Sequence, residues 1–303
     1  MVEPDIKKVN LSPKMPSSGV GIKADRPFLS QLVIYSILIV GAVIAIIPFF
    51  WMISNSLMTF GETIINKIVP STPHWKNYQD VVEQIKLGKL FLNSVLLALG
   101  TIAGLLFTSI LAGYAFASIN FKGKDLIFSA FLATMMIPES VTLLPNYLMI
   151  QNRILPMPGG SWMNTYWALT VPFMANAFSI FLLRQFFAQV PKELWDAARM
   201  DGADHLRYLI QIVLPISKAP ILTVVLFAFT ASWNALQWPL LVTTKEVWRP
   251  MVLGLYSYIT GEGGPQTNLS MAAAVLTIIP ILVFYFLVQK QFTQGIATTG
   301  LKG

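Results

Sequence analysis

The stretch ELWDAARMDGADHLRYLIQIVLP, residues Glu193 to Pro215, decides how the chain is organised. It places acids, bases and one Gly between two long apolar runs, in a chain with 55% hydrophobic and only 12% charged residues. An ordinary soluble domain carries about 25% charged residues. The composition therefore indicates a membrane protein, and the charged stretch indicates a segment that lies outside the bilayer.

Apolar runs of membrane-spanning length follow one another along the chain. A bilayer core needs about 20 apolar residues in helical form. Such runs are expected at about 29–53, 91–118, 126–150, 166–187, 208–240 and 269–288. Pro138 and Glu139 interrupt the third run, and Pro215 and Pro220 are expected to kink the fifth. The sequence therefore predicts an all-α polytopic membrane protein with six transmembrane helices.

The two ends of the chain differ from the membrane domain, which we place at 28–290. Residues 1–27 are polar and rich in Pro, Ser and Gly, so we expect a disordered tail. Cytoplasmic segments carry an excess of Lys and Arg. With the N-terminus inside, 14 of the 21 Lys and Arg residues fall in cytoplasmic segments and the other seven outside. Both termini are therefore predicted to be cytoplasmic, as are the tail 291–303 and the opening stretch.

Local signals divide the segment 191–207 into a helix, a turn and the start of a second helix. Pro191 suits the first turn of a helix, where its missing N–H costs nothing. Glu193 and Asp196 follow, where the helix dipole favours negative charge. Gly202 is expected to end the helix in a left-handed conformation, and Asp204 to cap the next one. Composition alone favours a solvated loop with a surface helix over a docking element, so the spacing has to decide.

The spacing of the small residues resembles a known transport motif. Asp196-Ala197-Ala198, three residues, Gly202, nine residues and then Ile212-Val213-Leu214-Pro215 resemble the pattern E-A-A-x3-G-x9-I-x-L-P. That pattern marks the permease subunits of binding-protein-dependent ABC importers. Asp196 stands where the family usually has Glu, which keeps the acid with a shorter reach. FLLRQFF, SWNALQWPL and QGIATTGLKG are similar to the carbohydrate-uptake branch, and within it to the six-span maltose-type permease partner.

The resemblance implies a type I ABC importer permease fold with a cytoplasmic coupling helix. This helix would seat on an ATPase subunit and turn ATPase closure into rigid-body movement of the spans. Gly202→Pro or Gly202→Asp is then expected to abolish uptake although the protein still inserts. The residues that the resemblance assigns to this contact are Glu193, Asp196, Ala197, Ala198, Arg199, Asp201, Gly202 and Ala203.

The implied function is that of the transmembrane permease subunit of an ATP-driven sugar importer in a bacterial or archaeal inner membrane. The implied partners are a homologous second permease, two ATPase subunits, an extracytoplasmic sugar-binding protein, the sugar and membrane lipid, without nucleic acid. The ending GIATTGLKG nearly matches a phosphate-binding loop, but Leu301 stands where Lys is required. We therefore expect no catalysis, metal or cofactor in this chain, and ATP with Mg²⁺ in the partner ATPase.

A sugar pathway requires hydrogen-bonding and aromatic side chains in or near the spans. Each such residue is equally suited to bonding one helix to another, which is the commoner use. Glu139 is either a functional intramembrane acid or a water-exposed residue at a helix break, and Pro138 favours the break. Gly100 and Gly104 form a G-x-x-x-G pattern that predicts close helix packing within the fold. The pathway candidates are Tyr114, Asn146, Asn176, Ser179, Trp233 and Asn234.

A secondary transporter driven by an ion gradient is the competing class. It would require intramembrane ionisable residues and an internal repeat, whereas the sequence offers Glu139 and no repeat. A membrane-embedded enzyme would require converging acid–base or metal groups. The two His residues, His74 and His205, fall on opposite sides of the predicted membrane, and Cys is absent. Oligosaccharides, polyols and glycerol-phosphate esters all fit the carbohydrate-uptake branch.

Overall fold

The computed structural model describes residues 28–152, 160–260 and 266–299, and within these ranges it contains helices and turns but no strand. The all-α class expected from the sequence is confirmed. The tail 1–27, predicted to be disordered, lies outside the described residues, as does the end of the chain after Thr299. The chain divides into two units, residues 1–49 and 50–303.

The first unit contains most of one long helix. α1 (Phe28–Ser56) continues for 29 residues, and its segment Ser30–Ser56 is long and apolar enough to cross a membrane. The helix contains no Asp, Glu, Lys or Arg, so no charged side chain has to be desolvated in a bilayer. Pro48 lies inside the helix.

The second unit holds two more helices of spanning length, α4 (Leu87–Ser118) and α15 (Thr267–Thr299). Three bent groups pass the same test when each group is counted as one span. The described residues thus hold three span-sized helices, or up to six spans, and the upper number equals the six expected. The groups are α5 (Lys124–Thr134) with α6 (Glu139–Ile150), α7 (Tyr166–Thr170) and η1 (Val171–Phe173) with α8 (Ala177–Phe187), and α10 (His205–Tyr208), η2 (Leu209–Val213) and α11 (Leu214–Ile216) with α12 (Lys218–Trp233).

Three of the runs expected as single spans are therefore divided, and the run 166–187 bends by 44° between Phe173 and Ala177. The run 126–150 bends by 97° at the break before Pro138, because the residue preceding a proline is pushed out of helical geometry. The run 208–240 bends by 81° at Ser217, two residues after Pro215, and α12 ends at Trp233. The wide π turn η2 ends at Val213, two residues before Pro215, whereas Pro220 lies in the first turn of α12, where no N–H is needed.

Helix α4 lies at the centre of the second unit and packs against α8 and α12. Glycines permit the close approach on its α7–α8 side. A Cβ at Gly100 would lie 1.7 Å from the Tyr166 hydroxyl, and one at Gly104 would lie 2.3 Å from Cγ of Met174. At Gly113 the nearest atom, Cβ of Leu183, would be 3.2 Å away. The close packing expected from the G-x-x-x-G pattern is confirmed.

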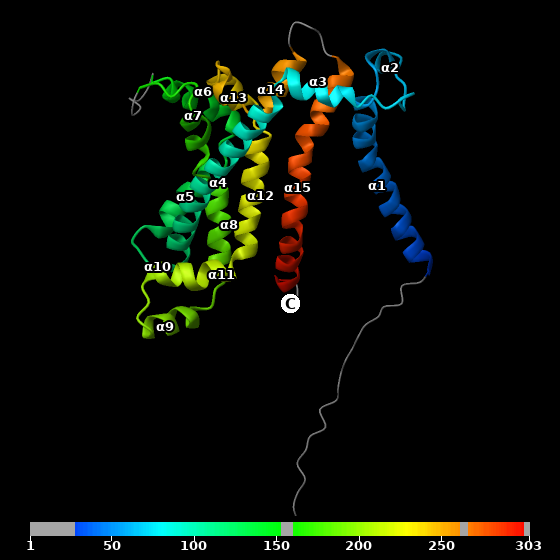
Figure 1. Ribbon diagram of the computed structural model, residues 1–303. Helices are drawn as coiled ribbons and strands as arrows, with labels where there is room; N and C mark the ends of the chain where they lie inside the picture. Colours follow the sequence, from blue (N-terminus) through cyan, green and yellow to red (C-terminus); the bar gives the residue numbers. More distant parts are fainter. Residues whose placement is uncertain (1–27, 153–159, 261–265, 300–303) are drawn as a thin grey trace, which may run out of the picture. The chain divides into compact units, whose positions relative to one another are not determined.

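The short helices gather at the two ends of the second unit (Figure 1). At one end lie α3, α6, α13 and α14, and at the opposite end lie α9 and α10. The predicted tail 291–303 begins inside α15, which continues to Thr299. The remaining short elements are α2 (Phe60–Ile64), α3 (Lys76–Gln84), α9 (Lys192–Met200), α13 (Gln237–Val242), η3 (Glu246–Trp248) and α14 (Met251–Ile259).

Candidate functional site

Helix α9 and the turn after it have the local structure that the sequence predicts. The left-handed backbone of Gly202, with φ +75°, ends the helix. The amide of Gly202 donates to the Arg199 carbonyl at 3.0 Å, and the amide of Ala203 donates to the Ala198 carbonyl at 2.9 Å. This pair of bonds is a Schellman motif. The Asp204 carboxylate then accepts from the backbone N–H of Arg207 at 2.8 Å and caps α10, so both predicted end signals are confirmed.

The two faces of α9 have different environments. Ala198 is 6% exposed and, with the half-buried Trp195, packs into the core cluster formed by α4, α8, α10, η2 and α12. On the other side Asp196 and Ala197 are exposed, and Met200 is 84% exposed. In the described part of the chain, no ion pair involves the charged residues of α9. The helix therefore presents small, apolar and charged groups on a face that no described residue covers.

An aromatic cluster fixes the inner face of α9. The Trp195 indole stacks on the His205 imidazole, with ring centroids 4.3 Å apart and planes 13° apart. Tyr208 meets the same indole edge-on at 5.0 Å. Nδ1 of His205 and the Tyr114 hydroxyl are 2.9 Å apart and share a hydrogen bond. Rings from three helices, α9, α10 and α4, thus meet at this end of the unit.

Comparison with known proteins identifies the family. Residues 104–298, which include α9 and its turn, match the family described as binding-protein-dependent transport system inner membrane component. The chain belongs to this family. It is a multi-pass inner-membrane component of a transport system. The competing hypothesis of an ion-gradient transporter finds no support in the comparisons.

Two relatives and one solved structure extend the match. The sn-glycerol-3-phosphate transport system permease protein UgpE of Yersinia pestis is 34% identical over 236 residues, covering 76% of this chain and 82% of the relative. The lactose transport system permease protein LacG of Rhizobium radiobacter is 30% identical, covering 89% and 96%. In fold, the permease is similar to a bacterial ABC transporter involved in the import of the acidic polysaccharide alginate, with TM-score 0.77, 21% identity and coverage of 89% and 98%.

Two of the predicted pathway residues of the permease are buried in packing contacts instead. Tyr114 is 4% exposed, and its hydroxyl bonds to His205 at the α9 end of α4. Trp233 is 1% exposed, and its indole N–H donates to the Thr277 carbonyl at 3.1 Å. A polar group buried among helices must be hydrogen-bonded, and these groups join one helix to another, so the structure gives both residues a packing role while their pathway role stays a prediction.

Two more pathway candidates serve the start of one helix. Asn176 caps α8, because its side-chain oxygen accepts from the amide of Ser179 at 3.1 Å. Ser179 itself is 5% exposed, so it lies inside the fold. Asn234 is exposed and ends α12, with its backbone N–H bonded to the Thr230 carbonyl. The Asn176 side chain therefore has a structural role at the start of α8, and no sugar contact is needed to explain its presence there.

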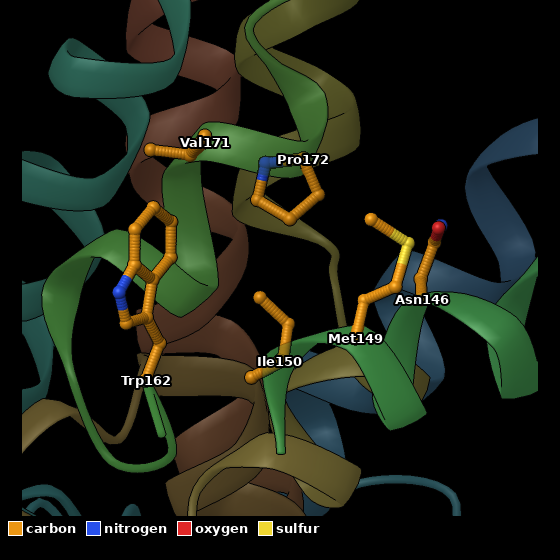
Figure 2. A pocket seen from close by; sticks show the side chains of 6 residues that line it. All are labelled: Asn146, Met149, Ile150, Trp162, Val171 and Pro172. Carbon is orange, nitrogen blue, oxygen red and sulfur yellow. The ribbon is translucent and has the colours of Figure 1, made fainter. Parts of the chain in front are cut away.

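Asn146 borders a cavity of about 200 Å³ (Figure 2). Figure 2 shows the indole of Trp162 on one side of it and Asn146 with Met149 on the other. Small-molecule sites usually occupy about 300–1,000 Å³, so this cavity is smaller than the usual ligand site. The residues that line it are Asn146, Met149, Ile150, Trp162, Val171 and Pro172.

Glu139 lies at the helix break, as Pro138 indicates. It is the first residue of α6 and is exposed. A carboxylate at this position is favoured by the helix dipole. A structural use at the start of α6 therefore accounts for this acid without a transport role.

Proposed function

We propose that the permease forms half of the translocation pathway of an ATP-driven carbohydrate importer and is coupled to its ATPase through α9. The proposed assembly adds a homologous second permease, two cytoplasmic ATPase subunits and an extracytoplasmic binding protein, with both termini of this chain in the cytoplasm. ATP and Mg²⁺ bind in the ATPase subunits, and this chain binds no cofactor.

The uncovered face of α9 is the observation that carries this proposal. Ala197 has no bulk beyond its Cβ, so a partner surface can approach the helix backbone closely there. Met200, with 84% of its surface exposed, offers a flexible apolar side chain that fits an irregular groove. Glu193, Asp196 and Arg199 surround these residues with charges that have no ion-pair partner among the described residues. A solvated surface helix would not need an apolar side chain as exposed as that of Met200.

The proposed cargo is a neutral carbohydrate. The relatives named above carry sn-glycerol-3-phosphate and lactose in their names, and a phosphate ester would require cationic partners along its route. Apart from the helix starts and from Lys290 in the last part of α15, the only cation in the described spans is Arg184, near the end of α8. Its guanidinium lies 4.8 Å from the centre of the Phe128 ring and is thereby engaged in packing. Hydroxyl groups of a neutral sugar need no such cations.

Reconstitution of the complete transporter tests the proposal. The permease is co-expressed with its partner permease and ATPase subunits, inserted into liposomes and supplied with the binding protein. We expect uptake of radiolabelled lactose or a similar neutral sugar only with internal ATP, and no uptake of sn-glycerol-3-phosphate. Sugar uptake driven by an ion gradient, without ATP or the ATPase, would contradict the proposed function.

A charge reversal on α9 tests the docking face itself. Asp196→Arg is expected to reduce co-purification of the ATPase subunits at least severalfold. The substitution places a cation where the contact has an acid, so the ATPase groups that meet Asp196 would repel the new charge or leave it unpaired. Asp125→Arg is the matched control, since Asp125 is an exposed acid in the first turn of α5 and lies outside α9. Equal recovery of the ATPase with both variants would show that α9 is not its docking site.

A further inference from the structure

We propose that Trp195, His205 and Tyr114 form a transmission contact through which movement of α9 reaches α4. The proposal rests on the docking role of α9 proposed above and concerns the opposite, buried face of that helix. The three residues are positioning residues, because they contact neither nucleotide nor sugar in this role. They connect the helix that meets the ATPase with α4, which packs against both α8 and α12 in the second unit.

Stacking and hydrogen bonding join the three residues in sequence, from α9 through α10 to α4. The Trp195 indole on α9 stacks face to face on the His205 imidazole at 4.3 Å. His205 is joined in turn to α4 by a hydrogen bond of 2.9 Å between its Nδ1 and the Tyr114 hydroxyl. Tyr208 packs against both Trp195 and Tyr114 and limits sideways movement of the rings. A displacement of Trp195 therefore has to move His205, and with it the hydroxyl of Tyr114, or break the hydrogen bond.

This hydrogen bond is the only one through side chains that joins the segment 191–208 to α4 among the described residues. The chain connections of α9 lead elsewhere, to α8 on one side and to α10 on the other. Apolar packing also touches α4, but it resists sliding weakly because it has no directional partner. The Tyr114–His205 bond thus fixes the register of α4 relative to α9.

The far end of α4 is fixed in a similar way. The Asn93 amide donates to the backbone carbonyls of Val247 and Arg249 at 3.0 and 2.9 Å. The Ser94 hydroxyl accepts from the amide of Met251 at 2.7 Å. From Ser94 to Tyr114 the helix rises about 30 Å, the thickness of a bilayer core. A shift of α4 at Tyr114 would therefore displace the segment 247–251, which is bonded to the opposite end of the helix.

Removal of single atoms from the link tests the proposal in the complete, reconstituted transporter. Tyr114→Phe removes the hydroxyl, and His205→Phe keeps a ring on Trp195 but removes the nitrogen. We expect each variant to assemble with the ATPase and to lose about three- to tenfold in sugar transported per ATP hydrolysed, the range for one hydrogen bond. The double variant should lose no more than either single variant, because all three lack the same bond.

A tyrosine on α7 that bonds to another position on α4 provides the matched control. The Tyr166 hydroxyl donates to the Leu96 carbonyl of α4 at 3.1 Å, so Tyr166→Phe removes the same atom from a contact that does not involve α9. Its transport-to-hydrolysis ratio should equal that of the unaltered permease. Unchanged ratios in Tyr114→Phe and His205→Phe, or losses that add in the double variant, would overturn the transmission contact.

Two further outcomes separate a structural role from the proposed one. A lower melting temperature with an unchanged transport-to-hydrolysis ratio would assign the three rings to stability alone and overturn the proposal. Failure of the unaltered permease to bind the ATPase would instead overturn the proposed function on which it rests. Intact assembly with a lowered ratio supports the transmission contact.

Discussion

Substitutions at Gly202 test how strongly coupling depends on the turn that ends α9. The φ of Gly202 is +75°, and a Cβ built there would have no atom within 4 Å. Any effect of a side chain must therefore come from the backbone conformation and not from a clash. The sequence alone treats Gly202→Pro and Gly202→Asp as equally disruptive, whereas this geometry separates them.

The expected magnitudes follow from the left-handed conformation. Ala at such a position costs about 1–2 kcal/mol, which lowers the population of the native turn by a factor of about 5–30. Asn and Asp tolerate the conformation better, so their cost is lower than that of Ala. Pro cannot adopt a φ of +75° and also loses the amide that bonds the Arg199 carbonyl, so about 3 kcal/mol or more is expected.

Uptake and ATPase binding of the series measure these costs. We expect the order Gly, then Asn and Asp, then Ala, then Pro, with uptake abolished only in Gly202→Pro. Membrane insertion should be equal in all variants, because the turn lies outside the spans. Wild-type uptake by Gly202→Pro would refute the argument, and so would a rank order that follows side-chain volume with Ala above Asn and Asp.

Three further perturbations probe other parts of the permease. Hydrogen bonds from Ser71 lower the pKa of Glu62, so the bonded segment 62–71 is favoured above the ordinary Glu pKa and is lost only as pH falls through the lowered value. Its hydrogen-exchange protection should stay constant from about pH 7 to about pH 5, and in Glu62→Gln it should be lower at both pH values. Trp233→Phe should cost about 1–3 kcal/mol in detergent unfolding without changing the apparent KM for the sugar, and a changed KM at full stability would restore a pathway role. Gly100→Ala should destabilise by about 1–3 kcal/mol because its Cβ overlaps a tyrosine hydroxyl, whereas Gly88→Ala, with open space around it, should be neutral or stabilising.

The features that the sequence predicts correctly are those that neighbouring residues determine. Apolar runs indicate the helices, and the limits of α9 follow from Pro191 and from Gly202, whose left-handed backbone ends the helix. The capping by Asp204 is also local, because donor and acceptor are three residues apart. Proline is a weaker guide: Pro215 marks a bend, but Pro220 lies harmlessly in the first turn of α12. The difference depends on where a helix begins, which the prolines alone do not determine.

The contacts that the sequence misses join residues far apart in the chain. Tyr114 and His205 are separated by 91 positions, and Trp233 and Thr277 by 44. Composition offers both tyrosine and tryptophan as sugar ligands, since each carries a ring and a polar group. In a bilayer, however, a buried hydroxyl or indole N–H must find an acceptor within the protein, and a neighbouring helix can supply that acceptor. A polar side chain in a span therefore suggests a pathway only when the packed helices leave its polar atom unbonded and facing open space, and neither Tyr114 nor Trp233 meets that condition.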